Sequence, residues 1–292
     1  MALPETGSRL SDEPTVPPEA PPAPAADGRV RRGRRQRPGL RRVLPWVTTL
    51  GVLIAWELFA RAGLFPPEFP PLTEVVEALY NLAGAGTLGP SLWETVSQFA
   101  VAMVSGSIAG VVLGVLLGKV HWLYRVTHLV LDFLRLIPAI VYLPLLLLLM
   151  GGRPETAMLI GSVGALWPVL FQTFYGVNGI SPVLRDTGRV YGLTSVQKLW
   201  SITLPTVLPF VATGLRIAAS HVLVVVVAVE LIVGVPGLGA DISTYSQGAA
   251  HPQMYALIFL TGVLGFLVNA GLIAIERRRL AWHVSYRQEQ SA

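Results

Sequence analysis

The stretch Arg185 to Arg216, RDTGRVYGLTSVQKLWSITLPTVLPFVATGLR, is a polar segment between two long apolar segments. Asp186 to Tyr191 can form one or two turns of helix, and Gly192 allows the backbone to turn sharply after them. Thr194 and Gln197 have the spacing of a capping box, which predicts that a second short helix begins there. We therefore expect a short helix pair that projects from a membrane into the cytoplasm.

The second short helix is predicted to end at Leu204-Pro205. Proline has no N–H to donate, and it disfavours helix in the residue before it. The next long apolar segment would then begin shortly afterwards.

Composition assigns the chain to a bilayer. Of its 292 residues, 52% are hydrophobic and only 13% are charged, whereas about a quarter of the residues of a soluble domain are charged. The absence of cysteine excludes disulfides, thiolate metal sites and cysteine nucleophiles. The net charge of +5 does not indicate nucleic-acid binding, because most of the basic residues lie in a few segments between apolar runs.

Six apolar segments are long enough for transmembrane helices, which need about 20 residues each. They are 43–62, 96–118, 129–150, 157–177, 207–233 and 254–275.

The distribution of basic residues predicts the orientation. With a cytoplasmic N-terminus, most of the 22 lysines and arginines fall on the cytoplasmic side, and an odd number of spans would move Arg277 to Arg279 to the other side. We expect residues 1–42 to be a disordered cytoplasmic tail rich in Pro and Arg, and residues 284–292 to be a cytoplasmic C-terminal tail. The arginines of the N-terminal tail either set the orientation or contact anionic membrane lipid.

Two predicted spans carry features of close packing or bending. Gly106, Gly110, Gly114 and Gly118 form one stripe along the second span, where another helix can approach closely. Pro138 in the third span removes a backbone hydrogen bond and can kink the helix, which makes this span a candidate for lining a pore.

Polar residues within the spans are candidates for the translocation path. Together with Pro138 we select Gln172 and His221, each of which could instead hydrogen-bond a neighbouring helix. Arg216 and Glu230 lie 14 residues apart, about 21 Å along a helix, so they cannot pair with each other.

The segments outside the spans also make predictions. TEVVEALYNLAGAG, residues 73–86, is expected to form a short helix on the outer surface, and Pro236 to Pro252 is expected to be an outer loop.

We find no catalytic set, no metal-binding set, no cofactor motif and no phosphate-binding loop, so the chain is not predicted to be an enzyme.

The segment around Gly192 resembles the cytoplasmic loop, often called the EAA loop, of permease subunits in ATP-binding-cassette importers. AVELIVGVPGLG, residues 228–239, and ERRRLAWH, residues 276–283, look most like the branch that transports nitrate, sulfonates, taurine and bicarbonate. The residues that match the loop pattern are Asp186, Thr187, Gly188, Arg189, Gly192, Leu204, Pro205, Pro209, Gly214, Leu215 and Arg216.

This resemblance implies an all-α membrane protein with six transmembrane helices and the MetI-like architecture of type I importer permeases. The permease domain would span residues 43–283, with a coupling loop at 183–206, in a bacterial inner membrane. The implied partners are two ATP-binding subunits, an extracytoplasmic solute-binding protein and a second copy of the permease. The coupling residues would be Asp186, Arg189, Gly192, Thr194, Leu204 and Pro205.

The resemblance favours a small anion as the substrate, although a thiamine-precursor pyrimidine or another small organic solute stays open. A competing hypothesis is a self-sufficient secondary transporter or channel. Such proteins often have two related halves with broken helices in corresponding places. No clear repeat of that kind is visible in this sequence.

Overall fold

The computed structural model describes residues 38–279, and every regular element among them is a helix. Within this range, the residues from Leu50 onwards form one compact unit, and the helix packing described below is that of this unit. The helices are α1 (Pro38–Arg61), α2 (Leu72–Gly84), α3 (Leu88–Lys119), α4 (His121–Leu134), η1 (Ala139–Tyr142), α5 (Leu143–Met150), α6 (Pro154–Asn178), α7 (Pro182–Val190), α8 (Ser195–Lys198), η2 (Leu199–Thr203), α9 (Leu204–Val233), α10 (Leu238–Gln247) and α11 (His251–Arg279).

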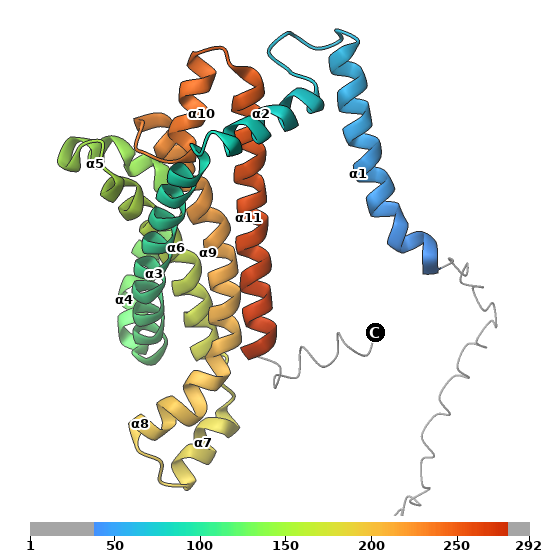
Figure 1. Ribbon diagram of the computed structural model, residues 1–292. Helices are drawn as coiled ribbons and strands as arrows, with labels where there is room; N and C mark the ends of the chain where they lie inside the picture. The colour runs from blue at the N-terminus through green and yellow to red at the C-terminus, as the bar shows by residue number, and fades with distance from the viewer. Residues whose placement is uncertain (1–37, 280–292) are drawn as a thin grey trace, which may run out of the picture. The chain divides into compact units, whose positions relative to one another are not determined.

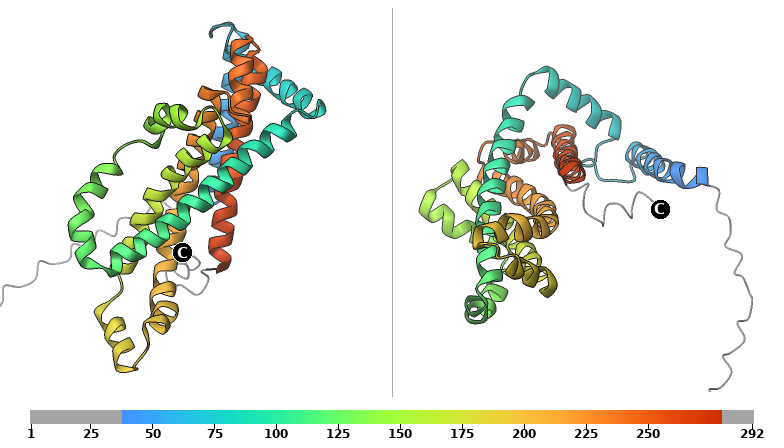
Figure 2. Two further views of the ribbon diagram at one scale, coloured as in Figure 1. Left: turned by 90° about the vertical axis from the view of Figure 1, so that its left-hand side faces the viewer. Right: turned by 90° about the horizontal axis from the view of Figure 1, so that it is seen from below.

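Four long helices form the bundle. α6 packs against both α3 and α9, and α11 packs against α9 (Figure 1). α7 and α8 lie beyond one end of these helices, which we call the elbow end, and α2 and α10 lie at the opposite, far end (Figures 1 and 2). The two ends are therefore built from different parts of the chain.

The predicted glycine stripe is the contact between α3 and α6. A Cβ atom on Gly114 would lie 2.6 Å from the carbonyl oxygen of Leu170, and one on Gly106 would overlap the carbonyl oxygen of Ser162. Both obstacles are backbone atoms of α6, which cannot move aside as a flexible side chain can. Any larger residue in this stripe would have to push α3 away from α6.

Four described helical segments are long and apolar enough to cross a membrane, and a fifth is added if one bent pair counts as a single span. These segments coincide with the second to sixth predicted spans. The first predicted span, 43–62, falls on α1, whose described residues do not meet the same criteria. The six-span prediction is consistent with these helices, although they do not fix the number.

The third predicted span is not one continuous helix. α4 and the Ala139–Met150 segment are bent by 83° at a break around Pro138, which has an extended backbone with ψ of 133°. The second proline of this span, Pro144, lies in the first turn of α5, where its missing N–H is tolerated. The kink expected at Pro138 is thus a complete break, and Pro144 begins a helix.

The second short helix does not end at Leu204-Pro205, as the sequence suggested. α8 continues through the π-helix η2 directly into α9, so residues Ser195–Val233 form one helical segment. Leu204 keeps helical dihedrals, with φ of −60° and ψ of −49°, and Pro205 falls in the first turn of α9. Proline at the start of a helix costs little, since the widened π turn comes before it.

The segment Pro236 to Pro252 is also not simply a loop. Most of it forms α10, whose residues Leu238 and Ile242 are buried together with residues of α2 and α11. Gly and Pro at the borders of this segment mark its ends correctly, but burial of its apolar residues makes its centre helical. The predicted outer helix at 73–86 is confirmed as α2.

The two predicted tails lie mostly outside the described residues. Residues 38–42 of the N-terminal tail belong to the first turns of α1. Residues 1–37 and the whole of 284–292 lie outside the described part of the chain.

Candidate functional site

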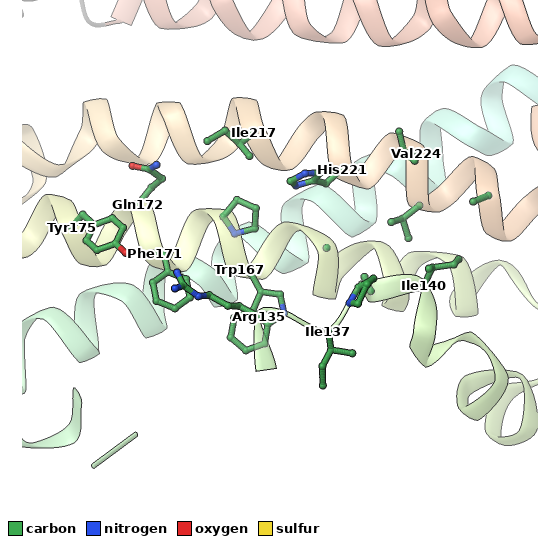
Figure 3. Close-up of a pocket in the computed structure, with 16 residues that line it drawn as sticks. Arg135, Ile137, Ile140, Trp167, Phe171, Gln172, Tyr175, Ile217, His221 and Val224 are labelled. Carbon is green, nitrogen blue, oxygen red and sulfur yellow. The ribbon is translucent and has the colours of Figure 1, made fainter. Parts of the chain in front are cut away.

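A cavity of about 700 Å³ lies between α6, α9 and the break that joins α4 to η1. Pro138 from the break, Gln172 from α6 and His221 from α9 all line it. The three residues that the sequence singled out for the path are therefore brought together from distant parts of the chain. Figure 3 shows the side chains of Gln172 and His221 within this group. We call this cavity the path cavity.

The polar groups of the path cavity are mainly hydrogen-bond donors. The guanidinium of Arg135 lies 4.5 Å above the ring centre of Phe171, and it also pairs with Asp132 on its own helical turn at 3.2 Å. The indole Nε1 of Trp167 is buried and has no hydrogen-bond partner among the described residues. Gln172 and His221 add an amide and an imidazole, so the cavity combines apolar walls with several groups that can donate.

Two residues of this cavity were missed by the sequence prediction. Neither Arg135 nor Trp167 was selected for the path, and both line the cavity (Figure 3). For α6, the sequence did contain a pattern that indicates which face of the helix lines the cavity. Trp167, Phe171 and Tyr175 follow one another at four-residue spacing and so share one face of the helix, and all three line the cavity.

The elbow, defined here as residues 182–203 of α7, α8 and η2, has the local structure that the sequence predicts. Gly192 has a φ of +63°, a conformation that L-residues with side chains rarely adopt. Thr194 and Gln197 form the capping box: the Thr194 Oγ1 accepts from the Gln197 N–H at 3.3 Å, and the Thr194 N–H donates to the Gln197 side chain at 2.9 Å. Ser181 caps the preceding helix, since its Oγ accepts from the Leu184 N–H at 3.3 Å.

The six predicted coupling residues do not form one cluster. Asp186 and Arg189 pair with each other on α7 at 3.0 Å and are well exposed, while Gly192 and Thr194 form the turn that follows. Leu204 and Pro205 instead lie at the base of the elbow, where η2 meets α9.

The elbow also presents large apolar side chains to its surroundings. Val190, Tyr191 and Trp200 are 84%, 77% and 64% exposed. Exposed apolar residues in such density, on a short segment that projects from the bundle, are typical of a surface that contacts another protein.

The sequence of the bundle and the elbow together matches a known family. Residues 106–280, more than half of the chain, match the family described as the binding-protein-dependent transport system inner membrane component. The chain belongs to this permease family. Its predicted all-α membrane fold and its resemblance to importer permeases are confirmed by this match.

Similar proteins and structures agree with the assignment. The taurine transport system permease protein TauC of Escherichia coli strain K12 is 28% identical over 260 residues, which cover 87% of this chain and 94% of that protein. The nitrate import permease protein NrtB of a Synechocystis strain is 25% identical, covering 80% of this chain and 88% of that protein. A chain of the MetNI methionine ABC transporter, solved in an inward-facing conformation, superposes with a TM-score of 0.57 at 24% identity and covers 65% of this chain and 95% of that chain, which supports the fold.

At the far end of this permease chain, a buried carboxylate joins three elements. Glu230, near the end of α9, is fully buried, and its Oε2 accepts from the Thr95 hydroxyl of α3 at 2.9 Å and from the Gly239 N–H of α10 at 3.0 Å. The Thr95 oxygen in turn accepts from the Leu238 N–H at 2.9 Å. Beside it, the Gln98 amide donates to the Pro236 carbonyl at 2.8 Å.

Two glycines of this segment lie where a side chain would not fit. A Cβ atom on Gly237 would overlap the carboxyl group of Glu230, and one on Gly239 would overlap the carbonyl oxygen of Val227. The backbone of Gly237 therefore lies against the Glu230 carboxyl group, and the backbone of Gly239 lies against α9. The GVPGLG sequence allows the chain to fold over the end of α9 and to donate its N–H groups to the carboxylate.

Arg216 has a partner on another helix. Its Nη2 donates to both carboxylate oxygens of Glu276 on α11, at 2.7 and 2.9 Å. The prediction that Arg216 and Glu230 do not pair with each other is confirmed, because each bonds groups elsewhere in the fold.

Proposed function

We propose that this chain is the membrane-spanning permease subunit of an ATP-binding-cassette importer and forms the translocation path for a small anion, such as a sulfonate, nitrate, taurine or bicarbonate. The observation that carries the proposal is the chemistry of the path cavity. Its polar lining consists mainly of groups that can donate, and no carboxylate occurs among the described residues that line it. The relatives named above for taurine and nitrate transport support the same class of substrate.

An anion that leaves water needs donors to replace its hydration shell, because an unpaired charge in an apolar environment is costly. Arg135, Trp167 and His221 offer such donors around one cavity. The remaining walls are apolar, so the anion would be held by a few hydrogen bonds only. Such a site favours passage, since a transported solute must leave as readily as it enters.

The energy source would be a separate ATPase that acts on the elbow. The chain contains no phosphate-binding loop of the kind that ATPases use, whereas the elbow exposes apolar side chains and the Asp186–Arg189 pair. Closure of two ATPase subunits would move two elbows and switch the path between inward-facing and outward-facing states. The path would then be in equilibrium between two states, and the ATPase would shift this equilibrium because its contacts with the elbow differ between them.

The proposal includes two copies of the chain, a solute-binding protein on the outer side and a bacterial inner membrane with both termini in the cytoplasm. The orientation rests on the positive-inside rule, because most of the basic residues lie in the segments assigned to the cytoplasm. The six coupling residues then face the ATPase side, and α2 and α10 face the outer side.

The test is transport by the purified complex. The tagged chain is isolated in mild detergent from the cells that produce it, together with the subunits that remain bound, and is reconstituted into vesicles with the cognate binding protein. We expect uptake of labelled taurine, nitrate or bicarbonate that requires ATP. Accumulation driven by an ion gradient without nucleotide hydrolysis would contradict the proposal and would favour a self-sufficient secondary transporter.

A variant pair tests the role of the path cavity. Arg135→Gln removes the charge over Phe171 and should reduce uptake of an anion more than it reduces ATP hydrolysis. Arg125→Gln is the matched control, because Arg125 is an arginine of the same helix region that does not line the cavity. Equal uptake by the two variants would exclude Arg135 from the path.

A further inference from the structure

A second cavity, of about 510 Å³, lies where the elbow meets the ends of α3 and α6. It shares no lining residue with the path cavity. Four basic residues line it, and they come from three helices: Lys119 from the last turn of α3, Arg185 and Arg189 from α7, and Lys198 from α8. We call it the basic cavity.

The positions of the lysines set this cavity apart from the rest of the chain. The whole sequence of 292 residues contains only two lysines, Lys119 and Lys198, and both line the basic cavity. They lie 79 positions apart in the sequence and belong to different helices, α3 and α8. In a chain whose other basic residues are all arginines, this is the one place where ammonium groups gather.

Two close helix contacts bring the four cations together. A Cβ atom on Gly118 would lie 2.7 Å from the Cβ of Val177, so the end of α3 meets the end of α6 closely and brings Lys119 to the cavity. A Cβ atom on Gly188 would lie 2.8 Å from the Cδ1 of Ile202 and 3.6 Å from the Cε of Lys198. The absence of side chains at Gly118 and Gly188 is what allows the cations to converge.

The cavity lacks the negative charge that would balance these residues. No Asp or Glu occurs among its described lining residues, and the nearby Asp186 pairs with Arg189. Within the described part of the chain, Lys119, Arg185 and Lys198 form no ion pair; Arg185 donates to the Val177 carbonyl at 3.1 Å. Cations held together without counter-charge repel one another, which favours binding of an anion.

The helix ends account for only part of this arrangement. The carbonyl ends of α3 and α6 carry partial negative charge, which stabilises Lys119 and Arg185. Arg189 lies in the last turn of α7 and is stabilised in the same way, whereas the helix of Lys198 continues directly into η2 and α9. Ser195 and Thr203 add hydroxyl groups to the lining, so the cavity offers neutral donors as well as charges.

We propose that the basic cavity is a binding site for a phosphate-type oxyanion. Lysine and arginine bind such groups through charge-assisted hydrogen bonds. A ligand there would bridge Lys119 on α3 to Lys198 on α8 and so tie the elbow to the bundle. The site goes beyond the proposed transport function, and it would exist whether or not the path cavity carries anions.

Two sources of this oxyanion fit the position of the cavity. The cavity lies at the ends of two candidate membrane spans, α3 and α6, where the headgroup phosphates of anionic phospholipids are found. A free anion of the same chemistry, such as inorganic phosphate, would reach it from solution, because Lys119 and Arg189 are exposed.

The experiment uses the two lysines as built-in reporters. The full chain, in an uncharged detergent or in nanodiscs, is acetylated briefly with an uncharged amine-reactive ester, and the acetylation of each lysine is measured by mass spectrometry. The probes are inorganic phosphate in detergent, compared with chloride at the same ionic strength, and nanodiscs of phosphatidylcholine with or without phosphatidylglycerol. We expect at least a severalfold decrease in acetylation at both lysines in one of these arms.

The detergent and nanodisc experiments distinguish a free anion from a lipid headgroup. Protection by phosphate in detergent assigns a free anion, and protection only in nanodiscs that contain phosphatidylglycerol assigns a lipid headgroup. Lys119→Gln should weaken the protection of Lys198, and Lys198→Gln should weaken that of Lys119. Arg153→Gln is the control, since Arg153 precedes α6 at its other end and should leave the protection unchanged.

Several results would overturn the proposal. Equal protection by chloride would mean simple screening, and no protection in any arm would mean that no oxyanion binds. Protection that appears only when an ATPase is bound would assign the cations to protein docking. Loss of transport in vesicles would not bear on any of these outcomes, so this test and that of the proposed function can fail independently.

Discussion

The far end and the elbow end of the molecule use charged residues and glycines in opposite ways. At the far end, Glu230 is fully buried and bonds two neighbouring elements, while Gly239 is needed because there is no room for a side chain. At the elbow, Asp186 and Arg189 are exposed, and Gly192 has no atom within 4 Å of where its Cβ would be. Gly192 is needed only for its backbone conformation.

This difference indicates that the far end holds its helices in place and that the elbow is available to a partner. A buried carboxylate that accepts from two elements fixes their relative positions, since breaking it leaves polar groups unsatisfied. Exposed charges and apolar groups on a short projecting segment contribute little to stability and remain available to a partner. Substitutions at the far end should therefore change stability, and those at the elbow should change function.

The largest effect is expected for Gly192→Pro at the elbow. Proline fixes φ near −65°, whereas Gly192 has a φ of +63°, and it removes the N–H that donates to the Arg189 carbonyl at 3.0 Å. ATP-dependent uptake should fall to background, while membrane insertion and the thermal stability of the bundle stay close to wild type. Gly192→Ala, which costs only about 1–2 kcal/mol of backbone strain, should retain part of the uptake. Wild-type uptake by Gly192→Pro would argue against a coupling role.

The second effect is a loss of stability at the far end. Gly239→Ala places a Cβ against the backbone of α9, including a contact of 2.8 Å to the Leu231 nitrogen, and should destabilise the protein by about 3 kcal/mol. The measurement is thermal unfolding of the purified chain in detergent. Gly248→Ala is the matched control at the other end of α10, where the nearest atom lies at an ordinary 3.4 Å. Equal melting temperatures for the two variants would contradict the packing described here.

A smaller loss of stability is expected for Thr95→Val. This change keeps the volume but removes the hydroxyl that donates to Glu230 and accepts from the Leu238 N–H, which should cost about 2 kcal/mol. Thr244→Val provides the comparison, because the exposed Thr244 hydroxyl bonds only the Ala240 carbonyl of its own helix. If both variants unfold at the same temperature, the Glu230 contacts do not hold the far end together.

The smallest effect should be local to the elbow. Thr194→Ala removes the cap of α8 and should cost about 1 kcal/mol, which is about a fivefold change in local opening. Hydrogen exchange should become faster at the amides of residues 195–198 and stay unchanged in the bundle. Thr187→Ala, which removes only a bond to the Val183 carbonyl within α7, serves as the reference. Faster exchange throughout the bundle would mean that the two ends are less independent than we infer.

Local features of the fold could be predicted from the sequence. The glycine stripe, the capping box and the turn at Gly192 each depend on residues within a few positions of one another, and each is found as expected. Pro205 was misjudged because its effect depends on its position within a helix, which the π turn before it sets. α10 was missed because its helix is stabilised by burial against α2 and α11.

The candidate sites depend on contacts between distant residues. Pro138, Gln172 and His221 were selected one by one, and only the fold shows that they line the same cavity. Glu230 and Thr95 are 135 positions apart, so their bond could not be read from either sequence segment. The basic cavity was missed for the same reason, although the rarity of lysine was visible in the sequence.

The uninterrupted run from α8 through η2 to the end of α9 has a mechanical consequence. Its 39 residues correspond to about 58 Å of helix measured along its path, which begins in the elbow and ends just beyond Glu230. A push on the elbow can therefore reach the far end through one continuous helical segment, without crossing a loop. The π turn η2 lies between α8 and α9, so its stiffness would determine how much of a displacement of the elbow is transmitted to the far end.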